Sequence, residues 1–226
     1  MTPIIFLPGA LGSAAQFDLL RAKMPDSSPV FALDFPGHGG SPVEAPFSVS
    51  LFADAVLQFL EEKDFGQVDI FGYSMGGYVA LWLAWKHPER VRSVITYGTK
   101  LDWTPEVAAG MSRMFDPEKI EAKAPQLAET LANTHGELHW KELCRRTAAF
   151  LHELGNGQGL PAEAFGSIQC PVTIGWGDQD NVVTEVESQL AAEAIPRGRF
   201  VVIPAGKHLL EQVDVHVMAD YIIKSR

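Results

Sequence analysis

The chain has 226 residues, 46% of them hydrophobic and 20% charged, so it can bury a substantial core within one domain. Its formal net charge of −10, with no basic block, predicts no nucleic-acid partner and no binding to anionic membranes. Cys144 and Cys170 show neither metal-ligand nor disulfide-framework spacing, which favours a reducing compartment.

The N-terminal segment is apolar but is not typical of a signal peptide. No basic region precedes Ile4 to Leu7, and Pro8-Gly9 interrupts the apolar run early. No stretch approaches the length needed to span a bilayer. We therefore expect a cytoplasmic protein without a membrane partner.

Short apolar runs alternate with helical patterns along the chain. Single helices separate most of these runs, and no hairpin signals occur, so the pattern predicts an α/β fold. We expect a mostly parallel, doubly wound sheet of about six strands, with ligands bound beyond the carboxyl ends of the strands. The expected strands are Ile4 to Leu7, Val30 to Leu33, Val68 to Phe71, Val91 to Tyr97, Pro171 to Trp176 and Arg199 to Ile203.

The alternation of strands and helices breaks between the fourth and fifth strands. Three helical stretches follow one another there, around Thr104 to Met114, Pro117 to Asn133 and Glu137 to Leu154. We therefore divide the chain into a core of residues 1–101 and 166–226 and a helical cap of residues 102–165. A cap over the carboxyl edge of the sheet is well placed to act as a lid, and a plain packing role is the alternative.

The segment Gly72-Tyr73-Ser74-Met75-Gly76 links the third strand to an apolar helix. A serine in so tight a strand-to-helix turn has a strained backbone, and flanking glycines remove side chains that would collide. Its hydroxyl is then exposed above the sheet. The Met75 amide begins the helix, where unpaired N–H groups favour negative charge. By itself the segment is also compatible with a chance glycine-rich turn.

A serine nucleophile needs a base and a carboxylate that orients the base. The loop after the fifth strand contains Asp178 and Asp180, and the loop after the sixth contains His208. Both loops are expected at the sheet edge to which Ser74 points. The Gly-x-x-Asp spacing from Gly177 favours Asp180 over Asp178, which would then be a loop-capping carboxylate.

The order of these motifs resembles that of the α/β-hydrolase superfamily, in its compact form with a small helical cap. The resemblance extends almost from end to end, through Asp34 to Ser41 (Asp-x-x-Gly-His-Gly-x-Ser), Gly72 to Gly76, and Gly177 with Asp180 and Val183. Pro8-Gly9 stands where members commonly have His-Gly, and Lys207 stands where a glycine commonly precedes the histidine. Neither departure removes a reacting atom.

The resemblance implies a serine hydrolase for a small ester or related acyl substrate, with Ser74, His208 and Asp180 as catalytic residues. It also implies an oxyanion hole formed by the backbone amides of Ala10 and Met75, and a reaction that needs no cofactor and no metal. Two alternatives stay open: lyase or carbon–carbon bond chemistry of the kind found in a menaquinone-pathway synthase, and ligand binding without turnover. The sequence indicates neither the substrate nor the oligomeric state.

Other polar residues allow a second interpretation. His135 and His139 are four positions apart, with Glu142 three further on, which imitates a metal site, but the spacing supplies no further ligand. The cap cations are expected on a solvated face, and one that pointed into the cleft would indicate a substrate with a carboxylate. These cations are Arg113, Lys141, Arg145 and Arg146.

Overall fold

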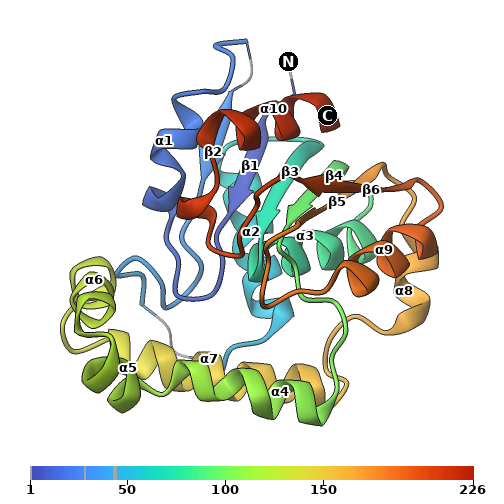
Figure 1. Ribbon diagram of the computed structural model, residues 1–226. Coiled ribbons are helices and arrows are strands. Elements are labelled where there is room, and N and C mark those ends of the chain that lie inside the picture. The colour runs from blue at the N-terminus through green and yellow to red at the C-terminus, as the bar shows by residue number, and fades with distance from the viewer. Residues whose placement is uncertain (1, 28, 43–44) are drawn as a thin grey trace.

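The computed structural model describes residues 2–27, 29–42 and 45–226. Within these residues, six parallel strands form one sheet in the order β2-β1-β3-β4-β5-β6 (Figure 1). The predicted parallel six-stranded sheet is therefore confirmed. The strands are β1 Ile4–Leu7, β2 Val30–Ala32, β3 Val68–Tyr73, β4 Val91–Tyr97, β5 Val172–Gly177 and β6 Gly198–Ile203.

Strand β2 differs from the expectation of a buried strand ending at Leu33. It has three residues, all half-buried, and Leu33 lies just beyond it. The cause is its position, because β2 is an edge strand that pairs with β1 alone. A run of apolar residues does not distinguish an edge strand from a central one.

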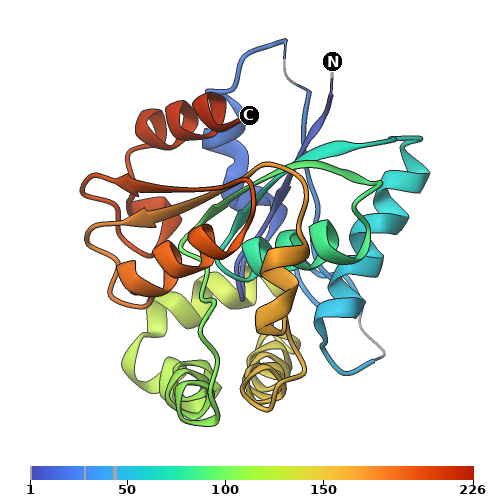
Figure 2. The same ribbon diagram turned by 90° about the vertical axis from the view of Figure 1, so that its right-hand side faces the viewer.

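Helices cover both faces of the sheet, and alternate strand residues supply the two cores. Ile5 and Leu7 of β1 face the first core, whereas Ile4 and Phe6 face the second. The first lies under α2 (Val49–Glu62), α3 (Met75–Lys86) and α9 (Glu185–Ala194), and the second under α1 (Asp18–Arg21) and α10 (Val215–Ser225). Figure 2 shows these two groups of helices on opposite faces.

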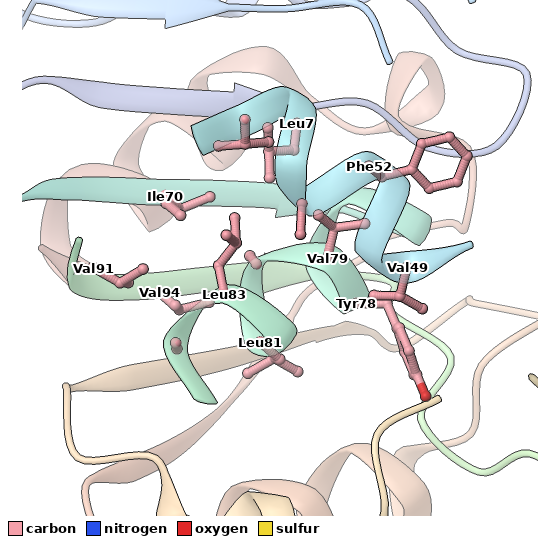
Figure 3. Packing of buried hydrophobic residues seen from close by; sticks show 14 of the residues in the cluster. Leu7, Val49, Phe52, Ile70, Tyr78, Val79, Leu81, Leu83, Val91 and Val94 are labelled. Atoms are coloured by element: carbon pink, nitrogen blue, oxygen red, sulfur yellow. The ribbon is translucent and has the colours of Figure 1, made fainter. Parts of the chain in front are cut away.

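Helix α3, which begins directly after Ser74, is buried almost all round. Figure 3 shows its Leu83 close to Val94 of β4 and its Val79 towards Phe52 of α2, while Leu81 projects from another side of the helix. All five of these side chains are at most 1% exposed. The apolar helix expected after the serine segment is therefore a central, buried one, and the packing gives the serine turn a rigid base.

The insertion between β4 and β5 consists of helices that lie together beyond one edge of the sheet (Figure 1). They are α4 (Pro105–Ser112), a 3-10 turn (Arg113–Phe115), α5 (Pro117–Lys123), α6 (Pro125–His135) and α7 (Trp140–Gly155). Helices of residues 105–155 thus form the inserted cap. The following short helix, α8 (Ala162–Ser167), contacts α3 and α9 of the core.

The expected cap helix from Pro117 to Asn133 is interrupted. Pro125 separates α5 from α6, because proline disfavours helical geometry in the preceding residue, here Ala124 at φ −140°. Outside the cap, the first helix, α1, follows a 3-10 turn (Ala14–Phe17). The last helix, α10, begins after Asp214, whose carboxylate accepts hydrogen bonds from the amides of His216 and Val217.

Other helix starts follow the sequence signals. Ser48 caps α2 by accepting from the Leu51 amide, and Thr184 with Glu187 forms a capping box at the start of α9. Among the helices of the described residues, none combines the length and the apolar character that a membrane span requires.

Candidate active site

Ser74 occupies the turn between β3 and α3 with a left-handed backbone, at φ +50° and ψ −116°. Left-handed conformations are costly for residues with a Cβ, and they persist only where the surroundings hold them. Here the Ser74 amide donates to the Tyr97 carbonyl oxygen at 2.8 Å, and the Thr99 hydroxyl donates to the Ser74 carbonyl oxygen at 3.1 Å. The end of β4 and the residues just after it therefore hold the predicted strained turn.

The glycines of this turn are required by close backbone approach. A Cβ on Gly76 would lie 2.2 Å from the Leu7 carbonyl oxygen, and one on Gly72 would lie 2.4 Å from the Gly77 Cα. Neither neighbour can move cheaply, because both are backbone atoms of buried segments. The predicted role of glycine beside the serine is thereby explained for this fold.

His208 lies between Ser74 and Asp180. Its Nε2 is 3.4 Å from the Ser74 Oγ, and its Nδ1 is 2.9 Å from the Asp180 Oδ2. The ring is 14% exposed and the Asp180 carboxylate is fully buried. The longer distance is typical of a catalytic hydrogen bond before substrate binds. The structure thus brings together three side chains from loops that follow β3, β5 and β6.

The Asp180 carboxylate is held as an anion. Burial by itself would raise its pKa, but hydrogen bonds from His208 and from the amides of Val183 and Val182 outweigh burial, and the pKa lies below its ordinary value. Asp178, the alternative considered from the sequence, is exposed. The contact to His208 is therefore made by the aspartate that the Gly-x-x-Asp spacing favours.

Two residues that the sequence analysis did not single out shape this site. The Tyr97 hydroxyl donates to the Lys207 carbonyl oxygen at 2.5 Å and so fixes the loop that carries His208. Gly98, at φ +60°, leaves space beside the pair: a Cβ there would lie 3.4 Å from both Asp180 Oδ2 and His208 Nδ1. The sequence signal for Gly98 was its position directly after an expected strand, at the carboxyl edge of the sheet.

Ala10 and Met75, the expected oxyanion donors, border the same cavity as Ser74. Ala10 belongs to a turn closed by a 3.0 Å hydrogen bond from the Gly12 amide to the Gly9 carbonyl oxygen, and Met75 is the first residue of α3. The two follow neighbouring strands, β1 and β3, between which the strand order reverses. Such a switch point opens a crevice for ligands.

A cavity of about 460 Å³ lies between the sheet edge and the cap. Ser74 and His208 contribute to its core wall. Its cap wall is largely apolar and includes Trp103, Met111, Phe115, Leu131, Phe150 and Leu154. Such a cavity suits an apolar group of a small ligand.

The charges near the cavity are mostly compensated. Lys100, which borders it, forms a 2.6 Å ion pair with Glu187, and both side chains are largely buried. On the cap, Lys141 pairs with Glu121, Arg145 with Glu118 and Arg146 with Glu142. Glu211 is exposed at the cavity wall. The site therefore favours an uncharged ligand over an anion.

The sequence spacing that imitated a metal site does not produce one. Both ring nitrogens of His135 contact backbone atoms, of Gly39 and Leu11, whereas His139 is exposed. In the part of the chain that the structure describes, no group of three or more His, Cys, Asp or Glu side chains is arranged to hold a metal ion.

Residues 2–148 match the family model of the alpha/beta hydrolase fold. The chain therefore belongs to the α/β-hydrolase family, as the order of its motifs and the sheet indicate. Esterases are among its relatives and among its structural neighbours.

Among the relatives is a pimeloyl-[acyl-carrier protein] methyl ester esterase from Aeromonas hydrophila subsp. hydrophila, 31% identical over 79% of this chain and 77% of that protein. A protein of the same name from Neisseria meningitidis serogroup C is 45% identical over 34% of this chain, and the match spans only 29% of its length. A thermophilic esterase from Thermogutta terrifontis has the same fold, with a TM-score of 0.79 at 20% identity, over 99% of this chain and 89% of that one.

Proposed function

We propose that this protein is a carboxylesterase-like serine hydrolase that acts on small, uncharged esters with an apolar acyl group. The observation that carries the proposal is the contact sequence from Ser74 Oγ through His208 to Asp180, at 3.4 and 2.9 Å, at the wall of an apolar cavity. A nucleophile, a base and an orienting carboxylate in this arrangement suit acyl transfer.

In the proposed mechanism, His208 Nε2 removes the Ser74 hydroxyl proton as the oxygen attacks the ester carbonyl carbon. Asp180 accepts the Nδ1–H of His208, keeps the ring in the required tautomer and stabilises the imidazolium. The amides of Ala10 and Met75 bind the oxyanion, with support from the dipole of α3. His208 then protonates the leaving alcohol, and water releases the acyl group by the reverse proton transfers. No cofactor and no metal takes part.

The core and the cap have different roles in this proposal. Residues 1–101 and 166–226 would supply the reacting groups, and residues 102–165 would cover the acyl chain. The apolar cap wall supports this assignment. The contacts of α8 with α3 and α9 attach the end of the cap segment to the core.

Labelling with a fluorophosphonate tests the proposal. An activated Ser74 is expected to react covalently, and Ser74→Ala is expected to lose the label while its thermal unfolding stays unchanged. Hydrolysis of p-nitrophenyl esters from acetate to decanoate then shows the acyl preference. Folded wild-type protein that neither reacts with the probe nor turns over any ester would refute the proposal.

A second candidate is the hydrolysis of a methyl ester on an acyl chain carried by a protein, as the names of the esterase relatives suggest. The apolar side chains of the cap wall suit an acyl chain. Faster turnover of a methyl ester on a carrier-bound acyl chain than of the same methyl ester without the carrier would support this candidate. Labelling of Ser74 without ester turnover would instead favour the lyase or carbon–carbon bond chemistry.

A further inference from the structure

The cap and the loop after β1 meet at His135, the last residue of α6. The residue is 1% exposed, its Nδ1 lies 2.9 Å from the Gly39 amide nitrogen, and its Nε2 lies 3.0 Å from the Leu11 carbonyl oxygen. A backbone amide only donates and a carbonyl only accepts. His135 is therefore neutral, with its proton on Nε2, and links two core loops that are far from it in sequence.

Leu11 is held by the cap a second time, through its side chain. It packs against the small apolar cluster inside the cap, formed by Ile120, Ala128, Leu131, Trp140 and Cys144. Its backbone is left-handed, at φ +57°. That conformation is unfavourable for a residue with a Cβ, so neighbouring contacts must maintain it.

The Leu11 conformation bears on the expected oxyanion donor beside it. Ala10 and Leu11 are the central residues of the turn closed by Gly12 and Gly9. The Leu11–Gly12 peptide carries both the carbonyl that His135 contacts and the Gly12 amide, which donates to the Gly9 carbonyl oxygen. That oxygen lies in the same planar peptide as the Ala10 N–H. The two hydrogen bonds therefore connect His135 to the orientation of the Ala10 amide.

We propose that His135 is a positioning residue: its hydrogen bond to the Leu11 carbonyl keeps the Ala10 amide oriented to bind the oxyanion. The catalytic use of this contact rests on the proposed function. The cap thus has a second task besides lining the cavity, because it completes the geometry of the core site.

The contact is sensitive to acid. Burial lowers the pKa of His135, while the hydrogen bond to Leu11 and the charge of Asp34 oppose the shift. The ring of His38, also uncharged near neutral pH, faces it with centroids 6.0 Å apart, and Glu137 and His139, which follow it, are exposed. Protonation would place a donor at Nδ1 against the donating Gly39 amide, so the contact is lost on the acid side.

Two substitutions separate the hydrogen bonds of His135 from its filling of space. His135→Leu removes both hydrogen bonds and leaves an apolar side chain in the buried position, whereas His135→Gln retains an acceptor and a donor at a similar spacing and cannot titrate. For p-nitrophenyl butyrate, His135→Leu is expected to lower kcat about 10- to 100-fold with little change in KM. His135→Gln should keep most of kcat and lose less of it in acid than the wild type. His139→Gln, on the exposed neighbour, is the control.

Two readouts do not depend on turnover. Nitrogen NMR of His135 should report the neutral Nε2–H tautomer, and hydrogen exchange at the Gly39 amide should be faster in His135→Leu than in wild type. If His135→Leu does not fold, the comparison of acid profiles between His135→Gln and wild type decides.

Unchanged kcat in His135→Leu, a rise in KM alone, or identical acid profiles for His135→Gln and wild type would each overturn the inference. A wild-type protein that lacks both labelling and turnover would instead refute the proposed function. The NMR and exchange data would then still decide whether His135 holds the loop.

Discussion

The two walls of the cavity are held in different ways. On the core wall, backbone hydrogen bonds and close glycine contacts hold the serine turn, and Tyr97 fixes the loop of His208. On the cap wall, apolar side chains pack into a small cluster, and the ion pairs lie largely on the surface. Backbone contacts tolerate little change, whereas side-chain packing adapts to similar residues. We therefore expect chemistry to depend on the core wall, supported from the cap by His135, and substrate preference to depend on the side chains of the cap wall.

The largest effect is expected on the core wall at Asp180. Asp180→Asn should lower kcat about 10⁴-fold, because the amide no longer holds the productive His208 tautomer. Asp178→Asn is the matched control and should stay near the wild type, since Asp178 is exposed. Steady-state kinetics with p-nitrophenyl butyrate measures both. The assignment of Asp180 is wrong if Asp178→Asn loses most activity and Asp180→Asn keeps it.

The next effect concerns His38, which lies beside His135 where the core meets the cap. The stability of the protein should depend on pH through this residue. Burial lowers its pKa from 6.5 to about 4, with the hydrogen bond to Pro36 opposing the shift and His135 adding to it. As pH falls below 6.5, the unfolded state binds this proton first, so stability present above that pH is lost towards pH 4. The loss from this group should be about 3 kcal/mol.

Urea unfolding at several pH values checks this expectation. His38→Asn can still donate to the Pro36 carbonyl oxygen but does not titrate. Its free energy of unfolding should therefore fall less between neutral pH and pH 4 than that of the wild type. Parallel curves for the two proteins would show that His38 does not contribute to acid unfolding.

An added methyl group should have opposite effects on stability in the core and in the cap. Gly76→Ala is expected to lower the free energy of unfolding by about 2–3 kcal/mol, since the new Cβ would meet the Leu7 carbonyl. Gly110→Ala, on the exposed surface of α4 with nothing within 4 Å of its Cβ, should raise it by about 0.5–1 kcal/mol. Denaturant midpoints measure both, and equal effects would contradict the comparison.

The smallest expected change concerns the cap wall. Phe115 borders the cavity, and Phe115→Ala should raise KM for a p-nitrophenyl hexanoate about fivefold, through loss of about 1 kcal/mol of apolar contact. KM for the acetate and kcat for both esters should change little. Leu138→Ala, a cap residue that is 87% exposed, serves as the control. A loss of kcat without a change in KM would show that Phe115 acts on chemistry rather than on acyl binding.

Much of the core could be predicted because its signals are local. Apolar runs predicted the strands, and the burial of α3 followed from its uniform apolar character. The interruption of the cap helix at Pro125 and the start of α10 after Asp214 each depend on a single residue that breaks or caps a helix. The spacing of apolar residues alone does not locate such boundaries. The half-buried state of β2 depends on its place at the sheet edge, which its own residues do not encode.

The sequence by itself determined which residues the core wall presents. Ser74, Asp180 and His208 each follow a strand, and parallel strands bring their carboxyl ends to one edge whatever the helices between them do. Only the tertiary structure decided which aspartate contacts His208, that Tyr97 fixes the loop of His208, and that His135 contacts Leu11 and Gly39. These are single contacts between distant segments, and no periodic pattern specifies them, because they depend on how the cap and the loops pack together.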